Sequence, residues 1–143
     1  IEEGYTELVN ILSLRYPDTV IGIIAGDEDM EFYAGIEEDL KKFKRANIIF
    51  FGTQNTMDDF ICIVSLASEV FTSDSLCFHI ATALSKYTVV IVGPTSYTEL
   101  DVFGNGKVVY SDKVDCLCCY LNKCGKSVTC MNTVTAEEIA KLF

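Results

Sequence analysis

The chain has 143 residues and a mass of 15.9 kDa, so we predict a single domain spanning residues 1–143. Half of the residues are hydrophobic, and this composition excludes a disordered or fibrous protein. The formal net charge of −10 makes nucleic acid a poor partner, and no apolar stretch approaches the roughly 20 residues that cross a bilayer, so we expect no transmembrane segment.

Helices and strands are predicted to alternate from the start of the chain. Apolar residues between Tyr5 and Leu12 recur at helical spacing, and this first helical run is broken before Pro17. Residues 20–25 then form a short, almost wholly apolar run that ends at Gly26. Such a run is typical of a strand in a parallel sheet that has helices on both faces.

The pattern continues to about residue 92. Acidic residues 27–29 suit the positive end of the next helix, and basic residues 41–45 suit its negative end. Further strands are predicted at 47–51, 70–72 and 88–92, and further helices at 60–67 and 76–84. Strands separated by helices indicate βαβ crossovers, hence a doubly wound, Rossmann-like α/β domain with a parallel sheet.

Both ends of the chain depart from a complete unit of this kind. Because the chain opens on a helix, we expect the first strand of the sheet, and a preceding domain, to lie upstream of Ile1. Beyond Thr95 we expect a short strand at 107–110, a Cys-rich segment at 112–131 and a final helix at 135–143. Thr135 and Glu138 have the spacing of a helix capping box.

Ligands of open α/β sheets bind beyond the carboxyl ends of the strands, where helix N-termini attract anions. There, Asp74 and Ser75 occupy a strand-to-helix turn, and His79 follows Ser75 by four residues, so both side chains share one helix face. These groups could hold a phosphate or a sugar hydroxyl, or they could merely cap the helix. A serine with one histidine and no third partner is a weak basis for nucleophilic catalysis.

Other loops at this edge carry weaker signals. Gly93-Pro94-Thr95 supplies a tight turn and a hydroxyl group, although an ordinary turn would have the same sequence. The segment from Gly52 to Thr56 is similar. The acidic residues 27–31 lack the alternation and central glycine of a calcium loop, so a solvated helix start is the preferred interpretation.

The block from Asp74-Ser75 through His79-Ile80-Ala81 to Gly93-Pro94-Thr95 resembles the C-terminal domain of glycosyltransferase family 9, the bacterial heptosyltransferases. The resemblance continues through Cys116, Cys119, Cys124 and Cys130-Met131 and covers roughly residues 5–143. Members are inverting, two-domain GT-B enzymes that transfer heptose from an ADP-sugar to the lipid A and inner core of lipopolysaccharide. The resemblance therefore implies the C-terminal, donor-binding half of a GT-B fold that lacks the N-terminal domain, in a cytoplasmic protein that is peripheral at the inner membrane when full-length.

The resemblance also implies roles for individual residues. The turn at Asp74 and Ser75 would hold the diphosphate and donor sugar with His79 beside it, the segment Asn55-Thr56-Met57 would flank the base, and Glu28 or Glu31 would approach the ribose. Leu76 stands where the family usually has glycine, so its side chain could crowd the diphosphate.

The family's catalytic base and its groove for the lipid-linked saccharide acceptor lie in the N-terminal domain. We therefore expect no catalytic residue in this chain and no sugar transfer by it alone. Two alternatives stay open: a non-catalytic module that binds a nucleotide-sugar, and a Cys-rich metal-binding or redox interaction domain.

Seven cysteines are present, and without a secretory signal we expect them in a reducing compartment. Cys62 and Cys77 lie in apolar helical patterns and are predicted to be small buried thiols. Cys116, Cys119, Cys124 and Cys130 have the spacing C-x2-C-x4-C-x5-C, which is loosely compatible with a structural zinc ion. Free thiols and a specific disulfide are the alternatives, and no cofactor is required by the donor-binding role.

Overall fold

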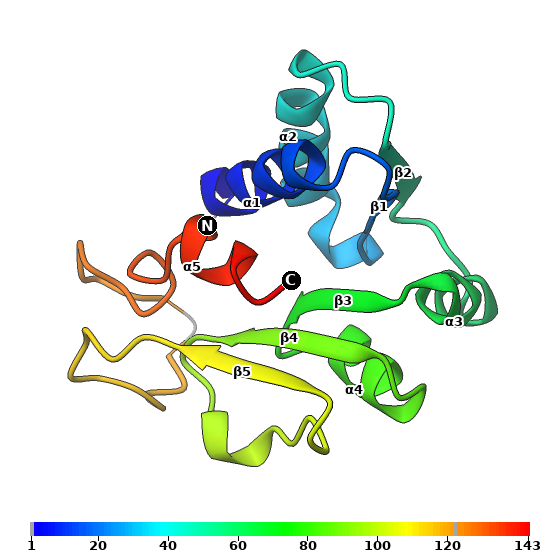
Figure 1. Cartoon of the computed structure of the whole chain (residues 1–143). Coiled ribbons are helices and arrows are strands. Elements are labelled where there is room, and N and C mark those ends of the chain that lie inside the picture. Colours follow the sequence, from blue (N-terminus) through cyan, green and yellow to red (C-terminus); the bar gives the residue numbers. More distant parts are fainter. Residues whose placement is uncertain (1, 122) are drawn as a thin grey trace. The chain divides into compact units, whose positions relative to one another are not determined.

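The computed structural model describes residues 2–121 and 123–143, and its contacts divide the chain into two compact units, Ile1–Asp59 and Phe60–Phe143 (Figure 1). The boundary falls within the first turn of a helix, α3 (Met57–Leu66). A single domain over residues 1–143 stays a prediction, and each unit is described here by itself.

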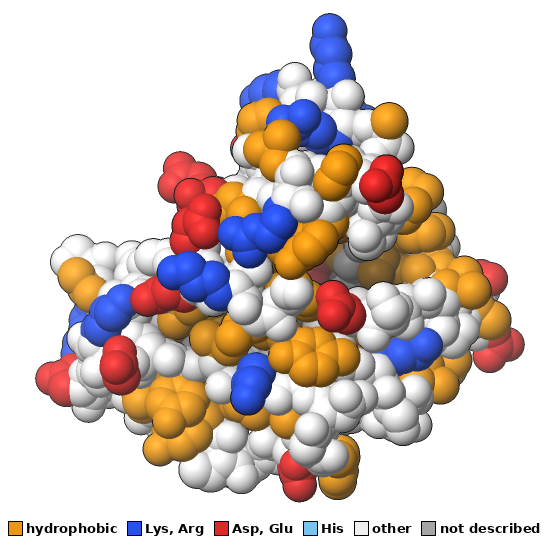
Figure 2. All heavy atoms as spheres, viewed as in Figure 1, with side chains coloured by type: hydrophobic (Ala, Val, Ile, Leu, Met, Phe, Trp, Pro, Cys, Tyr) orange, Lys and Arg blue, Asp and Glu red, His pale blue; other side chains and the backbone are white. Residues whose placement is uncertain are grey.

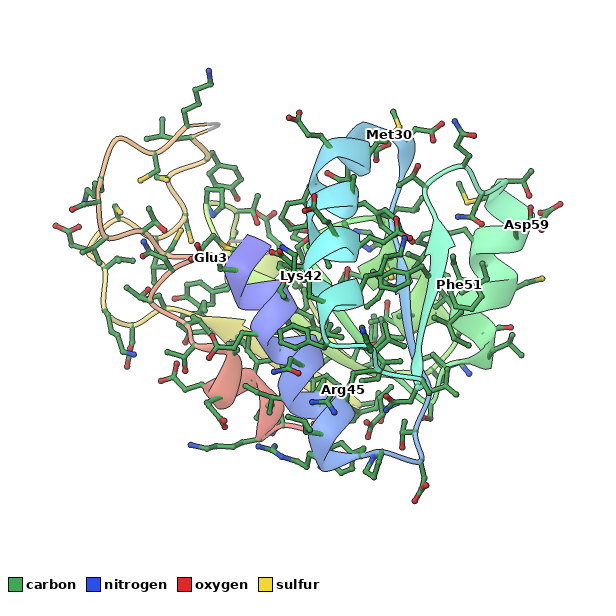
Figure 3. The ribbon with its side chains drawn as sticks, turned by 90° about the horizontal axis from the view of Figure 1, so that it is seen from above. Glu3, Met30, Lys42, Arg45, Phe51 and Asp59 are labelled. Atoms are coloured by element: carbon green, nitrogen blue, oxygen red, sulfur yellow. The ribbon has the colours of Figure 1, made fainter. Side chains whose placement is uncertain are left out.

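The first unit is a two-stranded parallel ladder covered by two helices. Its elements, in chain order, are α1 (Glu2–Arg15), β1 (Ile21–Ile24), a 3-10 turn η1 (Asp27–Asp29), α2 (Met30–Lys42) and β2 (Ile48–Gly52). Ile21 pairs with Ile48, and the register shifts between Ile23 and Ile24. Figure 3 shows Met30 at the start of α2 and Phe51 on β2.

Successive side chains along the strands of this unit point alternately to a face covered by helices and to an exposed face. Val9 of α1 and Ile36 and Leu40 of α2 form the buried core, against the inward side chains of β1 and β2. The neighbouring residues of β2, Ile49 and Phe51, remain exposed, as the period of two in a strand requires.

The second unit contains a three-stranded parallel sheet. After α3 come β3 (Glu69–Ser73), α4 (Leu76–Ala83), β4 (Tyr87–Val92), a 3-10 turn η2 (Tyr97–Glu99), β5 (Gly106–Tyr110) and α5 (Ala136–Ala140). The strand order is β3-β4-β5. Figure 1 shows α4 and α5 on opposite sides of this sheet, and the hydroxyl of Tyr87 donates a 3.1 Å hydrogen bond to the carbonyl of Leu142 beyond α5.

Most of the predicted architecture is confirmed. Each predicted strand is present within one or two residues, every described strand pair is parallel, and α-helices connect the strands from β1 to β4. In the described residues the strands form two separate hydrogen-bonded ladders, β1-β2 and β3-β4-β5. The predicted capping box at Thr135 and Glu138 is present, although α5 has only five residues and ends well before Phe143.

Two surface features bear on the predictions. No helix in the described part of the chain has both the length and the hydrophobicity needed to span a membrane. On the face shown in Figure 2, acidic and basic side chains are interspersed with exposed hydrophobic ones. The net charge of −10 therefore does not gather into one acidic patch on that face.

Candidate functional site

The carboxyl edge of the β3-β4-β5 sheet brings three loops together. Ser73 pairs with Ile91, and Val92 pairs with Tyr110, so the chain leaves all three strands at nearly the same level. The turn at 74–75, the turn at 93–95 and the loop from Ser111 therefore start side by side. Two of these loops carry predicted ligand-binding residues.

The turn between β3 and α4 leaves the start of the helix open. Ser75 has the extended backbone of an N-cap residue, but its side chain makes no capping hydrogen bond. Its Oγ instead lies 3.0 Å from Oγ1 of the buried Thr72, which also donates to the carbonyl of Ser73. The first N–H groups of a helix have no partner within the helix. The N–H of Phe78 donates to the carbonyl of Ser75 at 3.1 Å, so those of Leu76 and Cys77 remain available to a ligand.

The predicted neighbours of Ser75 are exposed on this helix. In the described residues, the carboxylate of Asp74 makes no hydrogen bond or ion pair, and Leu76 is 53% exposed. The His79 ring packs edge-on against Phe78, with centroids 5.1 Å apart, and no hydrogen bond joins it to Asp74 or Ser75. The three polar groups thus share the start of α4 without forming a network among themselves.

Cys77 lies just behind this turn. Burial raises the pKa of the Cys77 thiol, and a hydrogen bond with Thr72 opposes that shift. A neutral, partly buried thiol agrees with its predicted role in packing. The same prediction is wrong for Cys62, which is exposed on α3. This helix is apolar almost all round, so periodicity does not distinguish its buried face.

Thr95 is the predicted residue whose environment points most directly to a ligand. Its Oγ1 is buried and has no hydrogen-bond partner among the described residues. Gly93, in contrast, is explained by packing within the protein. A Cβ at Gly93 would come 2.6 Å from Sδ of Met131, so the close approach of this side chain favours a glycine there.

The acidic residues predicted near the ribose lie in the first unit. Glu28, Asp29, Glu31 and Phe32 line an open hollow of about 370 Å³ at the start of α2. The carboxylate of Glu28 covers Gly26, where a Cβ would lie 2.8 Å from either carboxylate oxygen. The two predicted acids therefore do share one surface.

The segment predicted to flank the base is partly engaged by the protein itself. Asn55 donates from Nδ2 to the carbonyls of Phe51 and Gly52, at 3.2 and 3.3 Å. Thr56 caps α3 by accepting from the backbone N–H of Asp59 at 3.2 Å. Of these three residues only Met57, which is exposed, is left without such a structural role in the described residues.

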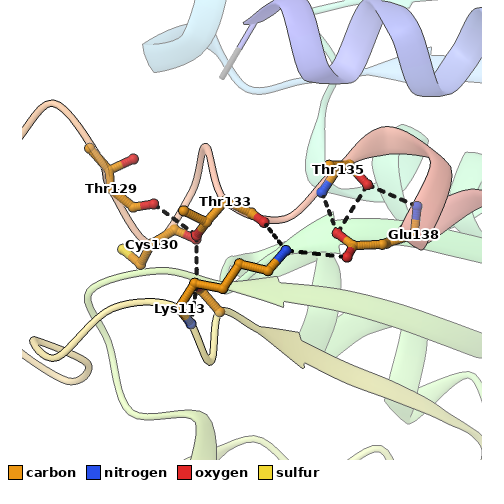
Figure 4. Close-up of polar contacts among 7 residues, drawn as sticks. Lys113, Thr129, Cys130, Thr133, Thr135 and Glu138 are labelled. Carbon is orange, nitrogen blue, oxygen red and sulfur yellow. Dashed lines mark hydrogen bonds and ion pairs between the residues drawn. The ribbon is translucent and has the colours of Figure 1, made fainter.

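A polar pocket at the end of β5 was not predicted from the sequence. It has a volume of about 280 Å³, and its walls include Lys113, Thr133 and Glu138 (Figure 4). Nζ of Lys113 donates to the carbonyl of Thr133 at 3.1 Å and lies 3.4 Å from Oε1 of Glu138, while Oγ1 of Thr133 donates to Oγ of Ser111 at 2.6 Å. Ser111 directly follows β5, just as Asp74 directly follows β3. This position after a strand was the sequence feature that could have indicated the pocket. Because these groups satisfy one another, the pocket supports no ligand assignment.

All seven cysteines are free thiols. In the part of the chain that the structure describes, no three His, Cys, Asp or Glu side chains are already arranged to hold a metal ion. The predicted zinc ligands Cys116, Cys119, Cys124 and Cys130 nevertheless lie in one segment that packs on the turn at Gly93.

The predicted donor-site residues are therefore divided between the two units. The second unit brings together Asp74, Ser75 and Leu76 with Gly93 and Thr95 at one sheet edge. The first unit holds Glu28 and Glu31 in one hollow and carries Asn55, Thr56 and Met57 between β2 and α3.

Comparison with known proteins supports the fold assignment. No family model and no curated protein matches the chain. Among solved structures, the chain is similar to the ADP-heptose LPS heptosyltransferase II of E. coli, with a TM-score of 0.77 and 17% sequence identity. The match covers 99% of this chain and 39% of the E. coli chain.

This similarity shows a heptosyltransferase-like α/β fold, corresponding to the C-terminal part of a GT-B enzyme. The fold expected from the resemblance to glycosyltransferase family 9 is thus confirmed. At this level of identity, the similarity assigns neither a substrate nor a role to any residue.

Proposed function

We propose that this chain binds an ADP-sugar of the ADP-heptose type, as the donor-binding part of a glycosyltransferase. The observation that carries the proposal is the open N-terminus of α4, which lies at the same sheet edge as the buried, unpartnered hydroxyl of Thr95. A diphosphate would accept hydrogen bonds from the free N–H groups of α4 and from Thr95, and the helix dipole would favour its negative charge.

The residues at this turn differ in charge, so we assign them to different parts of the ligand. The carboxylate of Asp74 would repel a phosphate, so Asp74 is better suited to accept a hydrogen bond from a sugar hydroxyl. Ser75, whose hydroxyl is shared with Thr72, lies closer to the helix end and would contact the diphosphate. The exposed ring of His79 would lie on the sugar side of Asp74.

The first unit would contribute contacts to the nucleotide part of the ligand. The hollow at Glu28 and Glu31 would accept the ribose hydroxyls, and exposed Met57 would contact the adenine base. Asn55 and Thr56 would shape this segment through their hydrogen bonds with the backbone rather than touch the base.

The wider activity follows from the proposed family. The sugar would pass to a lipid-linked saccharide of the lipopolysaccharide core, in the cytoplasm and at the inner membrane surface. The chain spans 39% of the length of the heptosyltransferase that it matches, so the acceptor and the catalytic base would be held by a part that corresponds to the remainder of that enzyme.

Calorimetric titration with an ADP-sugar tests the donor site. Asp74→Ala and Ser75→Ala should each weaken ADP-sugar binding about tenfold, which corresponds to the loss of roughly 1.4 kcal/mol. Asp18→Ala, which removes an exposed carboxylate from the loop before β1, should bind as the unaltered protein does. Unchanged affinity in both site variants would remove the assignment.

A second titration tests the effect of Leu76, which stands where glycosyltransferase family 9 usually has glycine. Leu76→Gly should tighten ADP binding if this exposed side chain crowds the diphosphate, and Leu76→Ala should have a smaller effect in the same direction. Equal affinity in all three proteins would mean that the side chain points away from the ligand. ADP binding without sugar transfer, even when a protein that supplies the acceptor-binding part is present, would favour the non-catalytic module.

A further inference from the structure

The first unit carries its basic side chains at one end. They are Arg15, the last residue of α1, and Lys41, Lys42, Lys44 and Arg45, at or just after the end of α2. Asp and Glu outnumber Lys and Arg in this unit, so the basic end does not simply follow from its composition.

Two loops meet at this end, at the edge where β1 and β2 begin. Nδ2 of Asn47, in the loop after α2, donates to the carbonyls of Tyr16 and Thr19, in the loop after α1, at 3.3 and 3.1 Å. The backbone N–H of Ile21 donates to the carbonyl of Asn47 at 2.8 Å. The ends of both helices therefore belong to one continuous surface.

Exposed apolar side chains lie among the basic ones. Leu14 is 55% exposed, Val20 is 61% exposed and Phe43 is 42% exposed. At the top of Figure 2, where Figure 1 draws the end of α2, basic side chains lie among hydrophobic ones. Single exposed hydrophobic residues are common on protein surfaces, but three at one end of a unit beside a basic cluster form an amphipathic patch. We call it the amino-edge patch, and it consists of Leu14, Arg15, Val20, Phe43, Lys44 and Arg45.

Ion pairs within the unit account for only part of the positive charge at this end. Lys41 and Lys42 pair with acidic residues one turn earlier on α2, at 2.8 and 2.6 Å, and also suit the negative end of the helix dipole. In the part of the chain that the structure describes, Lys44 and Arg45 form no ion pair, and Nε of Arg45 is buried without a hydrogen-bond partner. These two cations are therefore available to an anionic partner.

The acidic start of α2 is too far away to cancel this charge. α2 has 13 residues and is therefore about 20 Å long. At physiological ionic strength, interactions between exposed charges are largely screened beyond roughly 8 Å. A surface that meets the amino-edge patch is therefore attracted by Lys44 and Arg45 and hardly repelled by Glu28 and Glu31. Asp18, in the loop before β1, is the carboxylate that lies closer to it in the sequence.

We propose that the amino-edge patch binds the anionic surface of a phospholipid bilayer. The ammonium of Lys44 and the guanidinium of Arg45 would contact lipid phosphates. The side chains of Leu14, Val20 and Phe43 would enter the boundary between the headgroups and the acyl chains. Binding at this boundary combines the burial of apolar area with electrostatic attraction to anionic lipids, and the patch offers both.

The apolar residues favour a bilayer over other anionic partners. A phosphate ion or a nucleic acid backbone would pair with Lys44 and Arg45 but would leave Leu14, Val20 and Phe43 in water. A nucleic acid would also extend along the acidic remainder of the chain, whereas a bilayer touches only the end that faces it. The bilayer is thus the partner that fits both features of the patch.

This proposal goes beyond the donor site and does not depend on it. The hollow at Glu28 and Glu31 lies at the start of α2, and the patch lies at the other end of this helix. Membrane binding through the patch would therefore leave the proposed nucleotide contacts open. Vesicle binding and ADP-sugar titration are separate measurements, so failure of one proposal is distinguishable from failure of the other.

Co-sedimentation of the whole chain with lipid vesicles tests the proposal. The protein should bind vesicles made of equal parts phosphatidylglycerol and phosphatidylcholine, and the binding should weaken as salt is added. Vesicles of phosphatidylcholine alone should bind about tenfold more weakly or not at all. Lys44→Glu combined with Arg45→Glu should weaken binding to the anionic vesicles by more than about tenfold, because each basic side chain near such a surface contributes about fivefold.

Matched variants separate the patch from a general effect of charge. Lys107→Glu combined with Lys141→Glu makes the same change in net charge at exposed positions of the second unit and should bind vesicles as the unaltered protein does. Phe43→Ser should weaken binding severalfold without a change in charge. Asp18→Asn, which removes a carboxylate from the loop before β1, should strengthen it.

Several results would overturn the proposal. They are absence of vesicle binding by the unaltered chain, equal binding to neutral vesicles, and an equal loss in the two double variants. Stronger displacement by inorganic phosphate than by chloride of equal ionic strength would make the patch a site for a free anion, and tighter binding of a single-stranded oligonucleotide would assign it to nucleic acid. Circular dichroism checks that each variant is folded, and the measurement on the unaltered chain decides even where a variant is not.

Discussion

Thr95 allows the proposed function to be tested at a single polar atom. Its Oγ1 is buried without a hydrogen-bond partner in the described residues, and such a group costs about 1–3 kcal/mol of desolvation that folding does not recover. Thr88, on the preceding strand, is fully buried, and its Oγ1 donates a 2.9 Å hydrogen bond to the carbonyl of Lys86. The two threonines therefore allow a direct comparison.

Replacing Thr95 by valine should separate stability from binding. Thr95→Val removes an unsatisfied hydroxyl, so we expect the free energy of unfolding to stay the same or to rise by up to about 1 kcal/mol. The same change should weaken ADP binding, because the proposed diphosphate contact is lost. Thr88→Val, which breaks a satisfied hydrogen bond, should lower stability by about 1 kcal/mol. Denaturant unfolding and calorimetry measure both effects, and a Thr95→Val protein as destabilised as Thr88→Val would contradict this interpretation.

Residue-level roles were predictable only where the signal is local. Thr135 and Glu138 satisfy each other three residues apart, so their spacing alone indicated the capping box. The side chain of Ser75 instead turns to Thr72, and Gly93 packs closely against Met131, which lies 38 residues further along the chain. Neither partner could be inferred from spacing, because each contact depends on how the strands align.

At the level of elements, β5 depends on one glycine. A Cβ on Gly106, at the start of the strand, would overlap the carbonyl oxygen of Thr88, the residue with which Gly106 pairs on β4. Gly104, two residues earlier, has a φ of +75° but nothing within 4 Å of a Cβ. The close approach of two backbones therefore requires glycine at 106, whereas only backbone conformation favours it at 104.

Alanine substitutions at these two positions should differ in cost. Gly104→Ala should lower the free energy of unfolding by about 1–2 kcal/mol through its left-handed conformation. Gly106→Ala must also push β5 away from β4, so we expect a loss of about 2–4 kcal/mol. Thermal or denaturant unfolding measures both. Equal losses would show that the strand shifts without penalty.

The capping box of α5 predicts that the stability of the protein depends on pH. Hydrogen bonds from the backbone and side chain of Thr135, together with Lys113, hold the pKa of Glu138 below its ordinary value of 4.5. A carboxylate with a depressed pKa contributes stability that is complete above the unfolded pKa and is lost as the pH falls through the folded pKa. Acid should therefore weaken the attachment of this helix.

Glu138→Gln tests that dependence. At pH 7 the variant should melt at a lower temperature than the unaltered protein. The difference should shrink as the pH falls below 4.5 and through the lower pKa of Glu138 in the folded state, since the side chain at position 138 is then neutral in both proteins. Glu7→Gln, on an exposed position of α1, serves as the control and should show no comparable trend. A difference that stays constant with pH would contradict the role of the charge.

On the scale of the whole molecule, the two compact units predict two separate patterns of protection of the backbone amides from hydrogen exchange. Leu40 is 1% exposed in the core of the first unit, and Val90 is fully buried in the sheet of the second. Leu40→Ala should cost about 2–5 kcal/mol and Val90→Ala somewhat less. We expect each loss to appear mainly within its own unit.

Native-state hydrogen exchange can follow the two units separately. Leu40→Ala should accelerate exchange of the β1 and β2 amides, and Val90→Ala should accelerate exchange of the amides in β3, β4 and β5. A uniform loss of protection in either variant would show that the chain opens as one cooperative body.

The α/β class, the strand positions and the helix that carries Asp74 were predictable because apolar runs and helical periodicity are local properties of the sequence. The division into two ladders was not, since hydrogen-bonded pairing depends on neighbours that the periodicity does not identify. The residues predicted to bind the donor belong to both units, and their placement at one common edge stays a prediction.

Each unit is one unbroken stretch of chain, residues 1–59 and then 60–143, and this has a consequence for synthesis on the ribosome. Translation of the last 84 residues, at about 5–20 residues per second, lasts roughly 4–17 seconds. Small units fold within microseconds to seconds. The pairing of β1 with β2 can therefore be complete before β5 is made, so that the apolar strands of the first unit are already occupied when the last strand of the second emerges.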